Sequence, residues 1–148
     1  MDIQGVPAVV TGGASGLGEA TARFLASQGA KVAVFDVQMD KAEAVAKDIG
    51  GIAVFCDVTS AESAEQAMQT AKDAHGLCGI AVNCAGIGNP GRIIGREGPM
   101  TLDFFSKVVQ VNLVGSFNIL RLAADQMKDR EANSDGERGV IISTASVA

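Results

Sequence analysis

One stretch, residues 11–18 with the sequence TGGASGLG, constrains the fold of this chain more than any other segment. The apolar run 6–10 before it has the length and β-branching of a buried strand, and residues 19–28 after it follow a helical pattern. A strand, a glycine turn and a helix in this order are the context in which such a motif binds the phosphates of a dinucleotide. We therefore expect the helix to begin at a bound pyrophosphate, with its free N–H groups and its positive end facing the anion.

The three glycines that define the motif each have a physical role. Gly12 can adopt the backbone angles that other residues avoid at the tight turn after the strand. Gly16 lets the main chain approach a pyrophosphate without a Cβ in the way, and Gly18 lets the helix pack closely on the sheet. Ser15 and Leu17 are expected to contact the cofactor through their main chains. We expect one apolar face of the helix, made by Leu17, Ala20, Phe24 and Leu25, to pack on the sheet.

An acidic residue at the end of the next strand is the second feature of a dinucleotide site. Residues 31–35 read as that strand, and Asp36 follows about 20 residues beyond the glycine motif, where a carboxylate meets the adenosine ribose. A carboxylate there accepts hydrogen bonds from the ribose hydroxyls and repels a 2′-phosphate. The pattern favours NAD over NADP as cofactor. It also disfavours the alternative of an ordinary glycine-rich turn without a ligand.

Composition limits the other classes of function. The chain has 148 residues, 47% of them hydrophobic, which predicts one domain spanning residues 1–148. No apolar run approaches the ~20 residues that cross a bilayer, and the first residues resemble no leader peptide, so we expect a cytoplasmic protein. A net charge of −5 without a basic cluster argues against nucleic acid or a membrane as partner.

The cysteines and the single histidine argue against a metal site. Cys56, Cys78 and Cys84 are odd in number and lack CxxC spacing, so we expect small buried residues in a reducing cytosol rather than disulfides. His75 is the only histidine, which argues against a triad based on histidine and against a site with several histidines. We expect it near the end of a helix and expect no metal.

Strands and helices alternate along the chain, which predicts a parallel sheet with right-handed crossovers. The apolar strands are nearly continuous, as in sheets covered on both faces. We expect strands at 6–11, 30–36, 52–56, 79–83 and 140–143, helices at 16–28, 40–49, 61–75 and 102–130, and a loop at 87–100. The predicted fold is α/β, a doubly wound parallel (Rossmann) sheet with strand order 3-2-1-4-5. A ligand then lies outside the C-terminal ends of strands 1 and 4.

Five segments, in this order, resemble the motifs of the short-chain dehydrogenase/reductase family. They are the TGxxxGxG loop at 11–18, the DVT segment at Asp57–Thr59, an NNAG-like turn at Asn83–Gly86, the helix segment Val111–Leu113, and the strand end Ile141–Ser146. The resemblance implies that Asp57 and Val58 meet the adenine and that Cys84, Ala85 and Gly86 line the cofactor. It implies catalytic roles for Asn112 and for Ser146, whose hydroxyl contacts the substrate oxygen. The implied reaction is hydride transfer between NAD and a secondary alcohol or ketone.

A closer similarity is to type 2 3-hydroxyacyl-CoA dehydrogenases. It covers residues 83–87 with the glycine-bearing loop after them, 111–118, 138–142 and 144–148. The similarity implies a small-molecule substrate, an acyl-CoA, and a homo-oligomer of the full-length form built on the long helix and the next one. We expect one face of that long helix, with Phe104, Val108, Val111, Gly115 and Leu122, to be core.

Several of these residues have a structural alternative. Asn112 is a poor helix-interior residue, so a kink with bound water that serves a proton relay would explain it, and a core Asn paired to a neighbouring backbone would too. Asp57 is able to cap the helix that follows, although Thr59 or Ser60 is the expected cap. Ser146 is able to cap a loop after a strand.

The sequence departs from the family pattern in three places. Cys84 replaces the second Asn of NNAG, and Ser143 stands where an Asn is common. The family's catalytic Tyr and its Lys should follow Ser146 by about a dozen residues, and this sequence contains no Tyr. We therefore expect a Rossmann domain that is incomplete at its C-terminus and a 148-residue chain that is inactive alone. The alternatives are an NAD-binding module without chemistry and a fragment that folds only with a complementary chain.

Overall fold

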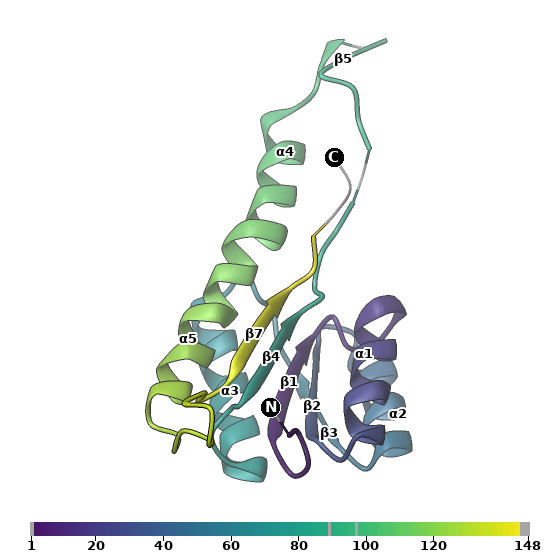
Figure 1. The fold of residues 1–148 in the computed structure, drawn as a ribbon. Coiled ribbons are helices and arrows are strands. Elements are labelled where there is room, and N and C mark those ends of the chain that lie inside the picture. Colours follow the sequence, from purple (N-terminus) through teal and green to yellow (C-terminus); the bar gives the residue numbers. More distant parts are fainter. Residues whose placement is uncertain (1, 89, 97, 146–148) are drawn as a thin grey trace.

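A computed structural model describes residues 2–88, 90–96 and 98–145. Its centre is a five-stranded parallel sheet in the order β3-β2-β1-β4-β7 (Figure 1). The strands are β1 (Pro7–Thr11), β2 (Lys31–Asp36), β3 (Ile52–Phe55), β4 (Ile80–Asn83) and β7 (Val140–Ser143). Since β7 is the fifth expected strand, the predicted order 3-2-1-4-5 and the doubly wound α/β fold are confirmed.

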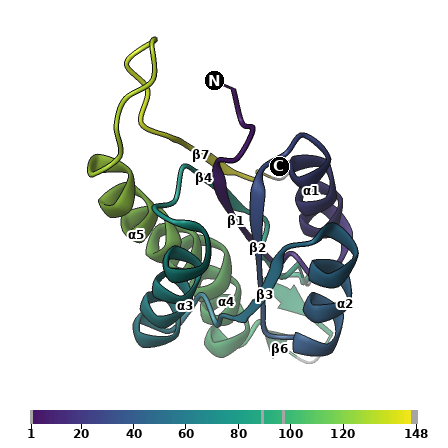
Figure 2. The ribbon, with the colours of Figure 1, turned by 90° about the horizontal axis from the view of Figure 1, so that it is seen from below.

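Helices cover both faces of the sheet (Figure 2). On one face lie α1 (Gly16–Ser27) and α2 (Met39–Ile49), and on the other α3 (Ala61–His75) and α5 (Ser116–Lys128). Neighbouring strand residues serve opposite faces: Val10 packs in the cluster with the α1 and α2 side chains, and Val9 packs in the cluster with those of α3 and α5. This two-sided burial is the reason why the strands read as almost unbroken apolar runs.

The register of the sheet aligns the C-terminal ends of β1, β4 and β7 at one edge. Thr11 pairs with Asn83 of β4, and Asn83 pairs with Ser143 of β7. The Thr11 hydroxyl oxygen also accepts hydrogen bonds from the backbone N–H groups of Cys84 and Ala85, at 3.2 and 3.1 Å. Thr11 therefore ties the turn after β4 to the end of β1, a role that the sequence analysis missed.

The prediction for the buried face of α1 is wrong in part. Leu17 and Phe24 are 69% and 64% exposed and Ala20 is exposed as well, whereas Gly18 and Ala22 are the buried residues of this helix. Small side chains face the sheet because α1 lies too close to it for large ones. Leu25 does pack against the core, partly buried, as predicted.

The long helix predicted at 102–130 is divided. It consists of α4 (Leu102–Val109), a π-helical segment η1 (Gln110–Gly115) and α5, which ends at Lys128. Val111 and Leu122 pack against the core and Gly115 is buried, as predicted. No residue of α4 is buried, so the prediction that Phe104 and Val108 belong to the core is wrong. The reason is that α4 extends beyond the end of the sheet (Figure 1).

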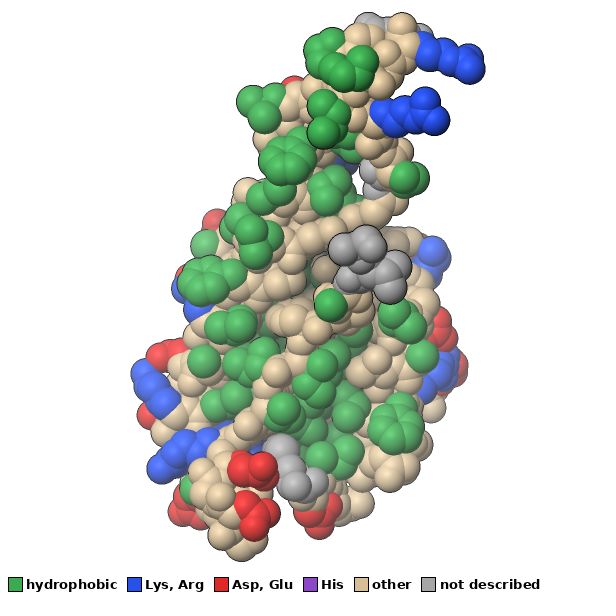
Figure 3. All heavy atoms as spheres, turned by 45° about the horizontal axis from the view of Figure 1, so that its top comes forward, with side chains coloured by type: hydrophobic (Ala, Val, Ile, Leu, Met, Phe, Trp, Pro, Cys, Tyr) green, Lys and Arg blue, Asp and Glu red, His purple; other side chains and the backbone are tan. Residues whose placement is uncertain are grey.

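The loop predicted at 87–100 contains a small antiparallel hairpin of β5 (Ile94–Gly95) and β6 (Gly98–Pro99). Hydrophobic side chains gather on this projecting part of the molecule, and cationic side chains stand beside them (Figure 3). Four of the exposed apolar residues here are Ile93, Ile94, Leu102 and Phe105. Across the described ranges, no helix is long and apolar enough to cross a membrane.

The cap of α3 offers a test of the local structure. The Ser60 hydroxyl oxygen accepts a hydrogen bond from the Ser63 N–H at 3.2 Å, which satisfies one free donor of the first turn. We predict that Ser60→Ala lowers the free energy of unfolding by about 1 kcal/mol, measured by urea denaturation. Ser134→Ala, in an exposed turn, is the control. Equal midpoints for both variants would contradict the assigned cap.

Candidate functional site

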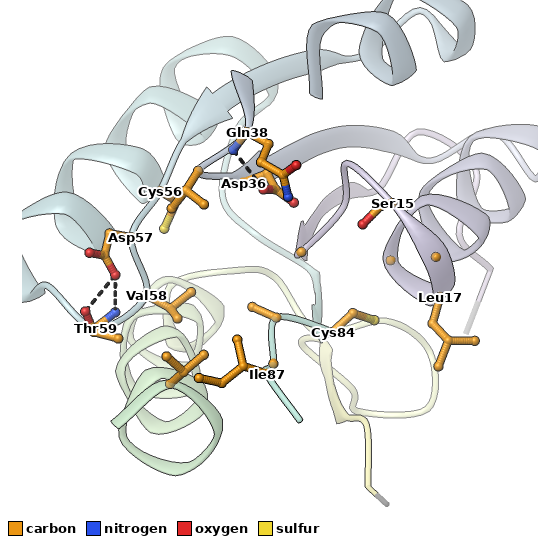
Figure 4. A pocket seen from close by; sticks show the side chains of 17 residues that line it. Ser15, Leu17, Asp36, Gln38, Cys56, Asp57, Val58, Thr59, Cys84 and Ile87 are labelled. Atoms are coloured by element: carbon orange, nitrogen blue, oxygen red, sulfur yellow. Dashed lines mark hydrogen bonds between the residues drawn. The ribbon is translucent and has the colours of Figure 1, made fainter. Parts of the chain in front are cut away.

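A cavity of about 460 Å³ lies at the C-terminal edge of the sheet (Figure 4). Four loops and one residue of η1 form its wall. The lining residues are Gly12, Ser15, Gly16, Leu17, Gly18, Asp36, Val37, Gln38, Cys56, Asp57, Val58, Thr59, Cys84, Ala85, Gly86, Ile87 and Val111. Every residue that the sequence assigned to cofactor contact is among them. Segments far apart in the chain therefore meet at the crevice between β1 and β4, where the topology places a ligand.

The glycine turn has the geometry that close backbone approach requires. Gly12 and Gly16 have φ angles of +63° and +54°, in the left-handed region that favours glycine. A Cβ on Gly18 would lie 2.1 Å from the Gly12 carbonyl oxygen, so this position admits no side chain. A Cβ on Gly16 would meet nothing within 4 Å, which leaves open space on the side of the turn where a ligand can approach.

The N-terminus of α1 forms part of the cavity wall. Ser15 is the N-cap residue, but its side chain makes no capping hydrogen bond. The first-turn N–H groups at Gly16, Leu17 and Gly18 have no acceptor within the helix. Together with the positive end of the helix dipole, they suit a phosphate group.

Asp36 stands between two walls of the cavity. Its side chain is 7% exposed. One carboxylate oxygen accepts a hydrogen bond from the Ala14 N–H at 3.1 Å, and the other accepts one from the Gln38 N–H at 2.9 Å. Each oxygen keeps a lone pair for another donor, such as a ribose hydroxyl. The carboxylate is therefore held in place by the glycine turn and by its own loop.

Asp57 shapes the loop after β3. One of its carboxylate oxygens accepts hydrogen bonds from the Thr59 N–H at 2.9 Å and from the Thr59 hydroxyl at 2.7 Å. The Asp57 N–H donates to the Ser63 hydroxyl oxygen at 3.0 Å. The side chain that caps α3 is that of Ser60, so the alternative that Asp57 is the cap is wrong.

Asn112 lies within the π-helical segment, and its side chain binds a backbone. Its Oδ1 accepts from the Ile87 N–H and its Nδ2 donates to the Ile87 carbonyl oxygen, both at 2.9 Å. The alternative of a pairing with a neighbouring backbone is confirmed, although Asn112 is exposed rather than core. The helix is irregular here, as a π-helical segment, and the bound water and proton relay stay a prediction. The pairing holds the segment after β4 against η1. Segments of π-helix are frequent at functional sites.

A second cavity, of about 790 Å³, adjoins the first. The two share the Cys84–Ile87 turn and Leu17, and the second also touches Asn112, Ser116, Thr144 and Ala145. Ser146, the predicted catalytic serine, lies outside the described residues. Asn83 donates from its Nδ2 to the Ser143 hydroxyl oxygen at 3.4 Å, which links β4 to β7 near this cavity.

The three cysteines are free thiols. Burial raises the pKa of Cys56 to about 12, and the nearby charges of Asp57 and Asp36 add to this rise. Burial raises the pKa of Cys78 to about 11. The prediction of small buried residues is confirmed for these two, whereas Cys84 is half-buried and lines both cavities. The described part of the chain contains no group of three or more His, Cys, Asp or Glu residues able to hold a metal ion.

Comparisons with known proteins agree on one family. The family model for short chain dehydrogenases matches residues 7–148. The 3-hydroxyacyl-CoA dehydrogenases type-2 of Drosophila melanogaster and Homo sapiens are each 45% identical over 150 residues and match 99% of this chain. The chain spans 59% and 58% of their lengths. The solved 3-hydroxyacyl-CoA dehydrogenase type-2 from Mycobacterium avium has a TM-score of 0.87 at 38% identity and covers 96% of this chain and 57% of its own.

The thiols provide a test of the site's geometry. Iodoacetamide must reach a thiol to alkylate it and reacts with the thiolate, and burial both covers Cys56 and Cys78 and raises the pKa of each. We therefore predict that the native protein at about pH 8 is labelled at the half-buried Cys84 and spared at Cys56 and Cys78. Mass spectrometry of peptides identifies the labelled positions, and denatured protein, labelled at every cysteine, is the control. Rapid labelling of Cys56 in the native protein would contradict its burial.

Proposed function

The chain belongs to the short-chain dehydrogenase family, and from this membership we propose an NAD-dependent oxidoreductase. The proposed reaction is hydride transfer between NAD and a secondary alcohol or ketone, with a 3-hydroxyacyl-CoA as the substrate. Dehydrogenases that are 45% identical support it. Because the chain spans less than two thirds of their length, the activity is proposed for the whole protein.

The position of Asp36 carries the proposal of NAD. Its carboxylate lines the same cavity as the glycine turn and is fixed there by two backbone N–H groups. A fixed carboxylate at the end of β2 accepts hydrogen bonds from the two ribose hydroxyls of NAD. The same charge repels the 2′-phosphate of NADP. No cationic side chain that would bind this phosphate is among the residues lining the cavity.

Each of the other walls of the cavity is proposed to bind a different part of the cofactor. The N-terminus of α1 would hold the pyrophosphate, Asp57 and Val58 would contact the adenine, and Cys84–Gly86 would contact the nicotinamide half. A nicotinamide bound there supplies the hydride acceptor and donor. The second cavity adjoins the Cys84–Ile87 turn, and in this proposal it holds the substrate next to the nicotinamide. In the proposed reaction Ser146 hydrogen-bonds the substrate oxygen and Asn112 supports proton transfer.

Two arginines support an acyl-CoA as the substrate. Arg92 and Arg96 lie with the β5–β6 hairpin on a further cavity of about 540 Å³. Pro90 lines both this cavity and the second one, so the two are neighbours. Coenzyme A carries several phosphate charges, and guanidinium groups on a cavity next to the proposed substrate cavity are suited to bind them.

An apolar stripe on α4, η1 and α5 supports a homo-oligomer. Its exposed members are Leu102, Phe105, Leu113, Val114, Phe117 and Leu120. Exposed large apolar side chains that gather along consecutive helical segments are typical of a protein interface. We propose that a second copy covers it, and the acidic net charge gives no support to nucleic acid or a membrane as partner.

The choice between NAD and NADP follows from the Asp36 charge. We predict that the protein binds NADH more tightly than NADPH and that Asp36→Asn narrows this preference about tenfold, because the repulsion of the 2′-phosphate is lost. Quenching or enhancement of NADH and NADPH fluorescence gives both Kd values. Asp40→Asn, which removes an exposed charge at the start of α2, is the control. Equal Kd values for the two nucleotides in the unaltered protein would contradict the proposed role.

The absence of Tyr favours a second candidate for the 148 residues alone, an NAD-binding module without chemistry. Without the family's general acid–base, we predict no NADH formation when this chain is mixed with NAD and a 3-hydroxyacyl-CoA. Absorbance of NADH follows the reaction, and a short-chain dehydrogenase of complete length is the positive control. Turnover by a chain whose mass is verified would overturn this prediction.

A further inference from the structure

We propose that Asn118 is a positioning residue for the adenine end of the cofactor. It lies on α5, outside the residues that line the cavity. Its side chain holds the loop Asp57–Ser60, two residues of which meet the adenine in the proposed function. This inference rests on that proposed function, because it assigns the residue that keeps the adenine loop in its binding shape.

The amide nitrogen of Asn118 donates its hydrogen bonds to this loop. The side chain is 7% exposed, and its Nδ2 donates to the carbonyl oxygens of Val58 at 2.9 Å and Ser60 at 3.2 Å. An amide nitrogen has two hydrogens, so both are used. Buried carbonyl groups that lose their donor destabilise the conformation that buries them. The loop is therefore held from α5 as well as from its own strand.

The Asn118 contact orients a whole peptide unit of the loop. The Val58 carbonyl and the Thr59 N–H belong to one rigid peptide plane. Asn118 binds the carbonyl oxygen at one side, and the Asp57 carboxylate accepts from the Thr59 N–H at the other, at 2.9 Å. Hydrogen bonds on both sides of the Val58–Thr59 peptide plane restrain its rotation. The Val58 and Thr59 side chains that flank it both line the cavity (Figure 4).

Gly115 packs closely against the same loop, from the same side as Asn118. A Cβ on Gly115 would lie 2.6 Å from Val58 Cγ2, so the helix backbone touches this side chain directly. Val58 belongs to the hydrophobic core on that face of the sheet and also lines the cavity. The position of Val58 in the cavity is therefore set by one hydrogen bond from α5 and one packing contact from the end of η1.

A charged pair keeps Asn118 itself in place. Asn118 Oδ1 accepts from Arg121 Nε at 2.9 Å, and Arg121 Nη2 pairs with Glu65 of α3 at 3.0 Å. This bond on Oδ1 fixes which end of the amide faces the loop, and Nδ2 is left to donate to the carbonyls. The pair is solvent-exposed, so its own contribution to the free energy of unfolding is small.

The test compares AMP, which carries only the adenine end, with NADH. In Asn118→Ala we expect the Kd for AMP and for NADH to rise about tenfold, as the loss of hydrogen bonds worth roughly 1.4 kcal/mol predicts. In the whole enzyme, the KM for NAD should rise while kcat changes less than twofold. Gln126→Ala is the matched control. Gln126 is another partly buried amide on α5, bonded to Cys78 and Met68. The Gln126→Ala substitution should lower the melting temperature and leave the Kd for AMP unchanged.

Gly115→Ala is the second variant, which displaces Val58 and leaves the amide in place. It should raise the Kd for AMP as well, so the proposal is tested even if Asn118→Ala does not fold. An unchanged Kd for AMP in the folded variants would overturn the proposal, and so would an equal rise in Gln126→Ala. Failure of the unaltered protein to bind AMP or NADH would instead contradict the proposed function.

Discussion

The contact between the start of α1 and the end of β1 determines how the rest of the site is built. At Gly18, a Cβ would lie 2.1 Å from the Gly12 carbonyl oxygen, so the helix begins against the turn only because this residue has no side chain. This contact places the free N–H groups of α1 at the wall of the cavity. The Ala14 N–H of the same turn then binds Asp36 at the end of β2. The proposed cofactor binding at this edge depends on that one close approach.

Two side chains transmit the same geometry to distant segments. Thr11 binds the backbone after β4 from the end of β1, and Asn118 binds the backbone after β3 from α5. Neither Thr11 nor Asn118 lines the cavity itself. Each orients a neighbouring backbone that does line the cavity, and each joins segments that the chain order separates widely. The walls therefore form a unit that is largely organised before a ligand arrives, which lowers the entropic cost of binding.

Much of the fold was predictable from the sequence because its signals are local. Alternating strands and helices predict a parallel sheet with right-handed crossovers, and the glycine turn with Asp36 points to the dinucleotide-binding strand order and to the edge where the site lies. Leu17 and Phe24 were misplaced because helical periodicity ranks residues by hydrophobicity. Close packing on the sheet instead favours Gly18 and Ala22. The bonds of Thr11, Asn112 and Asn118 depend on tertiary distances, which no pattern in one sequence contains. The β5–β6 hairpin was hidden because its residues are mostly those of loops.

Titration of the protein with NAD, followed by the amide signals in ¹H–¹⁵N NMR spectra, tests the central claim most directly. The claim is that the cofactor's pyrophosphate lies at the N-terminus of α1 and its adenine against the loop after β3. The account predicts the largest shifts at the amides of Gly16, Leu17 and Gly18, with further shifts at Val58 and Ala85. No saturable shifts, or shifts confined to the β5–β6 hairpin, would contradict it.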